Sequence, residues 1–181
     1  LDKKACERSG MGAFLAVAQG SDHPPVFLHL RYRTAAKSRK HLPRIALIGK
    51  GITFDSGGLS LKTAEGMETM KIDMAGAAAV LGVFSVLPRL GVPLDVDGYI
   101  AACENMPSGH AAHPGDVVRS ASGTTIEILN TDAEGRLTLA DAITEARREH
   151  PDVIIDLATL TGACVVALGE EITGLMSNND E

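Results

Sequence analysis

The stretch "RIALIGKGITFDSGGLSLK", residues 44–62, decides the fold because it joins an apolar run to a glycine-rich segment that carries charges. The run 44–49 predicts a buried strand, and Lys50, Asp55 and Lys62 follow it. The segment has too many glycines for a helix, and they allow the backbone to turn tightly. Ligands of open α/β sheets gather beyond the carboxyl ends of strands. We therefore expect a functional site after this strand.

The rest of the chain alternates strand and helix patterns. Four more apolar runs predict strands, at residues 26–32, 94–103, 125–129 and 152–159. Helical patterns cover about 68–90, with a stop at Pro88 and Gly91, and about 136–150. This order predicts one α/β domain of three layers, with a central mixed, largely parallel sheet flanked by helices. Residues 1–10 look like the tail of a helix, and residues 172–181 look like a strand running into a loop. We therefore expect residues 1–181 to be part of a larger protein.

Composition excludes several classes of protein. The chain has 181 residues, 45% of them hydrophobic, and a formal net charge of -6, which does not favour binding to nucleic acid or to an anionic membrane. The basic segment 31–44 is interpreted as a solvated loop. Three widely spaced cysteines without a C-x-x-C pair give neither a disulfide framework nor a thiolate zinc site, and favour a reducing, cytoplasmic setting. We find no apolar run of about 18 residues and no signal peptide.

The segment "NTDAEGR", residues 130–136, places Asp132, Glu134 and Arg136 at alternate positions before a predicted helix. In an extended segment these three side chains would point to one side. Desolvating two carboxylates together is costly unless a cation neutralises them. The alternative is structural, with Asp132 as the N-cap of the helix and Glu134 as a partner of its dipole. This segment by itself leaves both interpretations open.

Asp55, and Asp73 near the start of the helix at 68–90, raise the number of such carboxylates to four, and two divalent cations would cancel their charge. Two-metal sites activate water and clamp a tetrahedral transition state. Carboxylate oxygens suit zinc, manganese or magnesium. No histidine lies in these segments, so Lys50 is the candidate nitrogen ligand, which requires its neutral form. The alternative for Lys50 is a salt bridge to an aspartate. "GKGITFDSGG" lacks the spacing of a phosphate-binding P-loop.

Five blocks together resemble the catalytic domain of the leucyl aminopeptidase family, the di-metal cytosol aminopeptidases. They are "GKGITFDSGGLSLK" (49–62), "MKIDMAGAAAVLG" (70–82), "ENMPSGHAAHPGDV" (104–117), "NTDAEGRLTLADA" (130–142) and "DLATLTGA" (156–163). The blocks follow the family's order, and "NTDAEGRL" is its signature. The resemblance covers most of residues 10–176.

The resemblance implies a role for each matching residue. Asp55 and Glu134 are expected to bridge the two metals, and Asp132 to complete the shell of one of them. Lys50 and Asp73 are expected to bind the other metal. Two catalytic residues are implied, Lys62 as the electrophile beside the scissile carbonyl and Arg136 as the holder of a bicarbonate that acts as general base. The implied substrate-binding residues are Met70, Asn130, Thr159, Leu160 and Gly162.

The implied activity is removal of the N-terminal residue, preferably leucine-like, from peptides with a free N-terminus, by a hydroxide that two metals activate. Two Zn²⁺ or Mn²⁺ ions per chain are expected, with Mg²⁺ or Co²⁺ as further options. The resemblance also implies a homo-hexamer, while the composition and charge argue against membrane and nucleic-acid binding. Residues 1–181 would be a partial catalytic domain, without the family's N-terminal domain and without the C-terminal part of the catalytic domain. The alternatives are an inactive fragment, a DNA-binding or scaffold oligomer, and a two-metal phosphoesterase.

Overall fold

A mixed four-stranded sheet forms the centre of the computed structural model, which describes residues 1–34 and 42–179. Its strands lie in the order β1-β3-β2-β6, with bounds β1 Val26–Tyr32, β2 Arg44–Asp55, β3 Asp95–Asn105 and β6 Val153–Leu157. β1 is antiparallel to β3, while β2 is parallel to both β3 and β6. This confirms the predicted mixed and largely parallel sheet.

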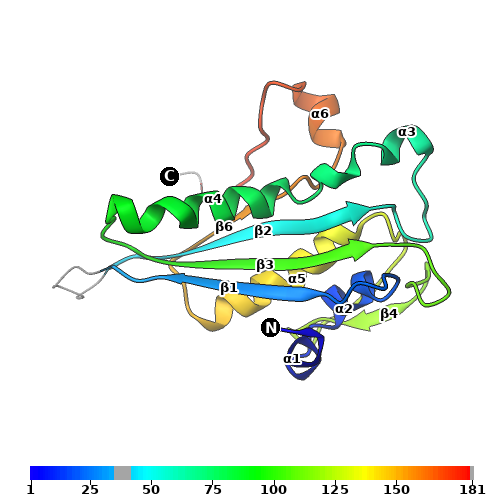
Figure 1. Cartoon of the computed structure of the whole chain (residues 1–181), viewed down its shortest axis with the longest axis horizontal. Helices are drawn as coiled ribbons and strands as arrows, with labels where there is room; N and C mark the ends of the chain where they lie inside the picture. The colour runs from blue at the N-terminus through cyan, green and yellow to red at the C-terminus, as the bar shows by residue number, and fades with distance from the viewer. Residues whose placement is uncertain (35–41, 180–181) are drawn as a thin grey trace.

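Helices cover both faces of the sheet. They are α1 (Lys3–Arg8), α2 (Gly12–Ala18), α3 (Ala64–Met67), the 3₁₀ helix η1 (Met70–Ile72), α4 (Ala75–Leu90), α5 (Glu134–Arg148) and α6 (Ala163–Leu168). α4 lies on one face, and α5 and α2 lie on the other (Figure 1). The three-layer prediction is therefore confirmed.

The side-chain alternation of β3 divides the core between the two faces. Tyr99 is fully buried in a cluster with Phe14 of α2 and Phe27 of β1. Ile100, the next residue, packs against Ala77 and Val80 of α4. Successive side chains of a strand point to opposite faces, so one strand supplies both halves of the core.

β2 is longer than its apolar run suggests. Lys50 and Asp55 were expected to follow the strand, but both lie within it. Their spacing of five residues would place them on opposite faces of a regular strand. The pairing with β3 shifts by one residue between Ile52 and Phe54, as in a β-bulge, so that Lys50 pairs with Ala101 and Asp55 with Asn105. The bulge therefore returns both charged side chains to the same face.

The expected helix at 68–90 is broken into shorter pieces. α4 begins at Ala75, contains Pro88, and ends at Gly91 in the left-handed conformation. The whole segment Ala64–Leu90 is long and apolar enough to cross a membrane by length and composition, which is weak evidence, because core helices of soluble proteins pass the same test. α4 itself has 16 residues and packs one side on the sheet.

The run 125–129 was expected to be a strand with the others. Only Thr125–Glu127 is a strand, β5, and it pairs with β4 (Val117–Arg119) as a separate antiparallel hairpin. This hairpin leads the chain toward the segment before α5.

A buried carboxylate joins the amino-terminal ends of β2 and β3. Asp97 lies with its Oδ1 2.9 Å from Arg33 Nη2 and its Oδ2 2.9 Å from Arg44 Nε, and His29 Nε2 lies 3.2 Å from Oδ1. Arg44 also binds Glu149 after α5. The interpretation of segment 31–44 as a solvated loop is therefore wrong at its two ends, while residues 35–41 lie outside the described part of the chain.

We expect Asp97→Asn to lower the free energy of unfolding by about 2 kcal/mol at pH 7, since it removes hydrogen bonds to charged groups. Burial alone would raise the pKa of Asp97, but the hydrogen bonds from Arg33 and Arg44 outweigh it and lower the pKa. The stabilisation is therefore complete above pH 3.8, the ordinary pKa, and is lost as the pH falls through the lower folded value. Urea unfolding between pH 7 and pH 3 measures this.

The control is Glu127→Gln, at an exposed carboxylate of β5, which should change the free energy of unfolding by less than about 0.5 kcal/mol. If the free energy of unfolding of the Asp97→Asn variant stayed below that of the wild type by a constant amount down to pH 3, the prediction would be contradicted.

Candidate metal centre

Charged side chains converge where the carboxyl ends of β2 and β3 meet the starts of two helices. Lys50 and Asp55 belong to β2, Asp73 directly follows η1 near the start of α4, and Glu134 is the first residue of α5. All four are at most 3% exposed. Asp132, in the turn before α5, is half-buried. The five residues predicted as metal ligands thus lie together, and their role as ligands stays a prediction.

Lys50 lies at the centre of one half of the cluster. Its Nζ is 2.8 Å from Asp73 Oδ1, 2.8 Å from Glu134 Oε1 and 3.0 Å from the carbonyl oxygen of Thr159. Burial by itself would lower the pKa of the Lys50 amine. Glu134 and Asp73 outweigh the effect of burial, so the pKa of the amine is raised. Without metal, Lys50 is thus an ammonium group in a salt bridge. Its neutral form as a metal ligand remains a prediction for the loaded site.

Lys62 has the matching position in the other half. Its Nζ lies 3.0 Å from Asp55 Oδ2 and 2.5 Å from Asp132 Oδ1, although the contact with Asp132 lacks hydrogen-bond geometry. Burial lowers and these two carboxylates raise the pKa of Lys62, with a net rise. Four carboxylates facing two ammonium groups leave an excess of negative charge.

The unpaired oxygens of the cluster fit divalent cations. Among the described residues, Asp73 Oδ2 and Glu134 Oε2 are buried and have no hydrogen-bond partner. Burial raises the pKa of both carboxyl groups, against the opposing effect of Lys50. Ligand oxygens of Asp55, Asp132 and Glu134 lie within 4.8 Å of one another. Such oxygen donors suit zinc, manganese or magnesium.

The segment "NTDAEGR" is a turn that enters α5. The N-cap of α5 is Ala133 and no side chain caps the helix, so the alternative of Asp132 as N-cap is wrong. Glu134 lies in the first turn, where the helix dipole favours a carboxylate. Because the helix has begun, Glu134 is buried while Arg136 is exposed, and the two do not share one side as they would in a strand.

Of the predicted substrate-binding residues, Thr159 and Leu160 contact residues of the cluster or next to it. Thr159, after β6, donates its hydroxyl to Asp73 Oδ1 at 2.7 Å, and the side chain of Leu160 lies beside Gly135. Asn130 is exposed and accepts a hydrogen bond from the backbone of Asp132. Of the other two residues, Met70 is half-buried in η1, and Gly162 is exposed at the start of α6.

Two loops next to predicted ligands are hydrogen-bonded to each other. Gly57 and Gly58, at φ values of 89° and 65°, turn the chain after Asp55. Thr131 donates its hydroxyl to the carbonyl of Gly57 at 2.7 Å and accepts from the backbone of Ser60 at 2.7 Å. The turn after β2 is thereby fixed to the residue that precedes Asp132.

Asn105 is a residue of the site that the sequence patterns do not single out. It is 4% exposed at the end of β3, and its side chain donates to Asp55. Its position in the block 104–117, two residues after a predicted strand, is the signal that would have found it. The two added residues of β3 bring it opposite Asp55.

The sequence model for the catalytic domain of the cytosol aminopeptidase family matches residues 1–181. The chain belongs to the cytosol aminopeptidase family. Probable cytosol aminopeptidases of Gloeobacter violaceus and Methylibium petroleiphilum are 60% and 61% identical to it over 181 and 180 residues. These matches cover 100% and 99% of the chain, and 36% and 37% of the respective relatives. The chain thus spans about a third of the length of these members of the family.

In this member of the cytosol aminopeptidase family, Gly135 leaves the space through which Lys50 reaches the cluster. A Cβ at this position would lie 2.8 Å from Lys50 Cε and 3.0 Å from its Nζ. We expect Gly135→Ala to displace the amine from Asp73 and Glu134. Zn²⁺ affinity, measured by competition with a chelating dye, should fall about 10- to 100-fold, as for other residues that orient ligands.

Gly82→Ala is the matched control, because a Cβ at this helical glycine of α4 meets nothing within 4 Å. It should leave Zn²⁺ affinity unchanged and stabilise the fold by about 0.5–1 kcal/mol. Equal Zn²⁺ affinities of the two variants would refute the role of Gly135.

Proposed function

We propose that the full-length protein removes the N-terminal residue from peptides in a metal-dependent reaction. The observation that carries this proposal is the set of four carboxylates and two lysines at the end of the sheet, with two buried carboxylate oxygens left without partners among the described residues. Membership of the cytosol aminopeptidase family supports a peptidase. Residues 1–181 would then be the part of the catalytic domain that holds the ligands.

Two groups of residues would hold the cations. Asp55, Asp132 and Glu134 offer oxygens close enough to share ions, and Lys50 and Asp73 lie beside Glu134. When bound, two divalent ions supply the Lewis acidity that polarises the scissile carbonyl and lowers the pKa of water. Zn²⁺ or Mn²⁺ fits this donor set best, with Mg²⁺ or Co²⁺ as further candidates.

Lys62 and Arg136 would stabilise the developing negative charge and support proton transfer in the reaction. Lys62, as an ammonium group at the mouth of the cluster, stabilises the oxyanion that develops on the scissile carbonyl. Arg136 is exposed on the first turn of α5, where its guanidinium can hold a small anion. Bicarbonate bound there would accept a proton from water as a general base.

The substrate would lie along the strand end after β6. Thr159, Leu160 and Gly162 offer backbone groups to an extended peptide, and Asp73 with its cation would fix the free α-amine. A binding site for that amine explains cleavage after one residue only. Met70 and Leu160 offer apolar side chains that favour a leucine-like residue, while Asn130, in the turn before α5, offers an exposed amide.

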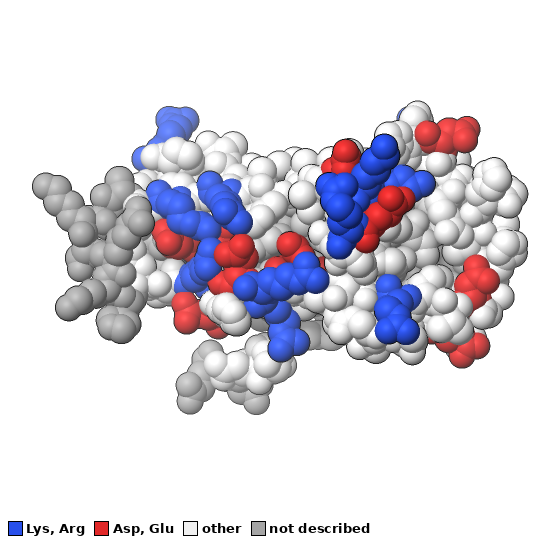
Figure 2. All heavy atoms as spheres, turned by 90° about the horizontal axis from the view of Figure 1, so that it is seen from below, with Lys and Arg blue, Asp and Glu red and all other residues white. Residues whose placement is uncertain are grey.

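The setting of the protein is part of the same proposal. The relatives' names place those proteins in the cytosol, which supports a cytoplasmic protein that acts on free peptides. The homo-hexamer that the family resemblance implies is part of the same proposal. Basic and acidic side chains lie interspersed on the face seen in Figure 2. The net charge of -6 over the whole chain does not favour nucleic-acid binding.

The test is hydrolysis of leucine p-nitroanilide by the full-length protein with Zn²⁺ or Mn²⁺. We expect Glu134→Gln, which keeps the shape of the side chain but removes its charge, to lower kcat/KM by about 100-fold or more, because loss of a residue that only orients a ligand costs 10- to 100-fold. A chelator should abolish the activity of the wild type, and added metal should restore it.

Glu127→Gln serves as the control and should retain the wild-type rate. N-acetyl-leucine p-nitroanilide should not be cleaved, since its α-amine is blocked. Equal rates for Glu134→Gln and the wild type would rule out the proposal, and hydrolysis of p-nitrophenyl phosphate alone would point to a phosphoesterase.

A further inference from the structure

Asn105 connects the strand that carries Asp55 to the turn that carries Asp132. It is the last residue of β3 and pairs with Asp55, the last residue of β2. The side-chain Nδ2 donates one hydrogen to Asp55 Oδ1 at 2.8 Å and the other to the carbonyl of Thr131 at 3.0 Å. Both hydrogens of the amide are thus used between two segments that lie far apart in the sequence.

Because of the hydrogen bond from Asn105, the two carboxylate oxygens of Asp55 have different partners. Oδ1 accepts from Asn105 and also from the backbone of Gly57 at 2.9 Å. Oδ2 faces the cluster, where Lys62 lies 3.0 Å away. Two donors therefore hold one oxygen, and the other is directed toward Lys62 and the predicted cation site.

The backbone of Asn105 adds a second connection. Its carbonyl accepts from Ser56 N at 3.0 Å and from Ser56 Oγ at 2.7 Å. Together with the bond to Thr131, Asn105 holds the residue after Asp55 and the residue before Asp132. One side chain and one carbonyl thereby set the separation of two predicted ligands.

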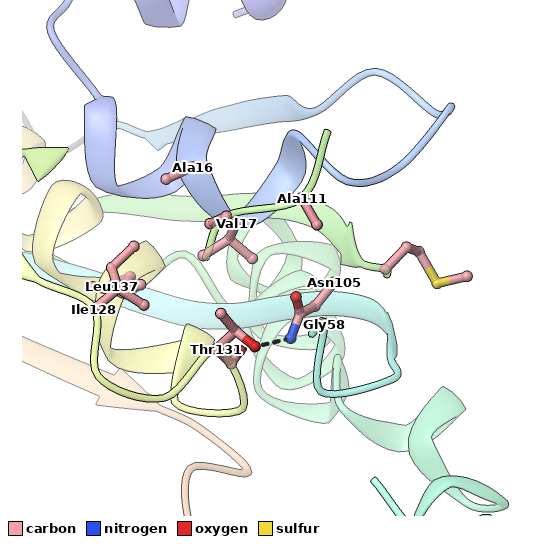
Figure 3. Close-up of a pocket in the computed structure, with 10 residues that line it drawn as sticks. Ala16, Val17, Gly58, Asn105, Ala111, Ile128, Thr131 and Leu137 are labelled. Carbon is pink, nitrogen blue, oxygen red and sulfur yellow. Dashed lines mark hydrogen bonds between the residues drawn. The ribbon is translucent and has the colours of Figure 1, made fainter. Parts of the chain in front are cut away.

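The side chain of Asn105 lies against the buried core. Figure 3 shows its side chain beside Gly58 and Thr131, with Val17 and Leu137 across a small pocket. The pocket has a volume of about 10 Å³, which is room for about one water molecule, and none of the predicted metal ligands lines it. The site is thus bounded on this side by a close-packed core rather than by a substrate cleft.

We propose that Asn105 is a positioning residue of the metal centre, which fixes the orientation of Asp55 and the distance between Asp55 and Asp132. This inference rests on the proposed function, because it assigns a role toward the same cations. An amide is required at this position. A carboxylate would have no hydrogen to donate to Asp55, and an aliphatic side chain would leave both acceptors without their partner.

The experiment compares Asn105→Leu and Asn105→Asp with the wild type in the full-length protein. Both substitutions keep the approximate size of the side chain, and Asn105→Asp provides a second variant if Asn105→Leu does not fold. Binding of Co²⁺ is followed by calorimetry and by the visible absorption of the ion, which reports its coordination. We expect a 10- to 100-fold loss of Co²⁺ affinity, as is typical for partners of ligands, and an altered absorption spectrum.

Asp97→Asn is the matched control, because Asp97 is a buried polar residue at the opposite end of the same strand. It should lower stability without changing Co²⁺ affinity or the spectrum. In the peptidase assay, the Asn105 variants should lose kcat while KM stays within about twofold of the wild type, because the residue does not touch the substrate.

Wild-type Co²⁺ affinity and spectrum in the Asn105 variants would overturn the inference, and so would an equal loss in Asp97→Asn. A wild-type protein that binds no Co²⁺, Zn²⁺ or Mn²⁺ would overturn the proposed function together with the inference. The two failures are distinguishable, because only the second affects the wild type.

Discussion

The structure depends on neutralising carboxylates that the fold removes from water. Asp55, Asp73 and Glu134 are at most 3% exposed, and an ionised carboxylate in such surroundings is very costly unless it is paired. Lys50 and Lys62 each contact two carboxylates but leave oxygens without partners. Asp55 comes from β2, Asp73 from the residue after η1 and Glu134 from α5, so the same electrostatic demand acts on three separate segments of the chain. The proposed divalent cations would meet this demand.

The β2–β3 pair gives the cluster its geometry. The bulge after Ile52 places Lys50 and Asp55 on one face, and the pairing of Asp55 with Asn105 brings a donor to the end of the strand. Asn105 also donates to the carbonyl of Thr131, and this hydrogen bond fixes the turn before α5 relative to the two strands. The positions of the predicted ligands therefore follow from strand register and hydrogen bonding, while the apolar core on both faces keeps the strands in place.

Local patterns in the sequence were sufficient to predict the layers, the type of sheet and the charged residues that meet. The bulge was not predictable, because a spacing of five between Lys50 and Asp55 indicates opposite faces unless the pairing with β3 is known. Asn105 was missed for the same reason, since its importance arises from a partner 50 residues away. The ion pair of Arg33 with Asp97 also joins distant segments, so the ends of a basic run were mistaken for a solvated loop.

The carboxylates at the two ends of the β2–β3 pair are paired with different side chains, arginines at one end and lysines at the other. This difference decides whether the paired group can also serve as an electron-pair donor. At the amino-terminal end, Arg33 and Arg44 bind Asp97 through guanidinium groups, which stay protonated and offer no lone pair. At the carboxyl-terminal end the partners are lysines, whose amines become electron-pair donors when they lose a proton. The arginine end can therefore only form ion pairs, whereas the lysine end offers amines of the kind that the proposed metal site requires.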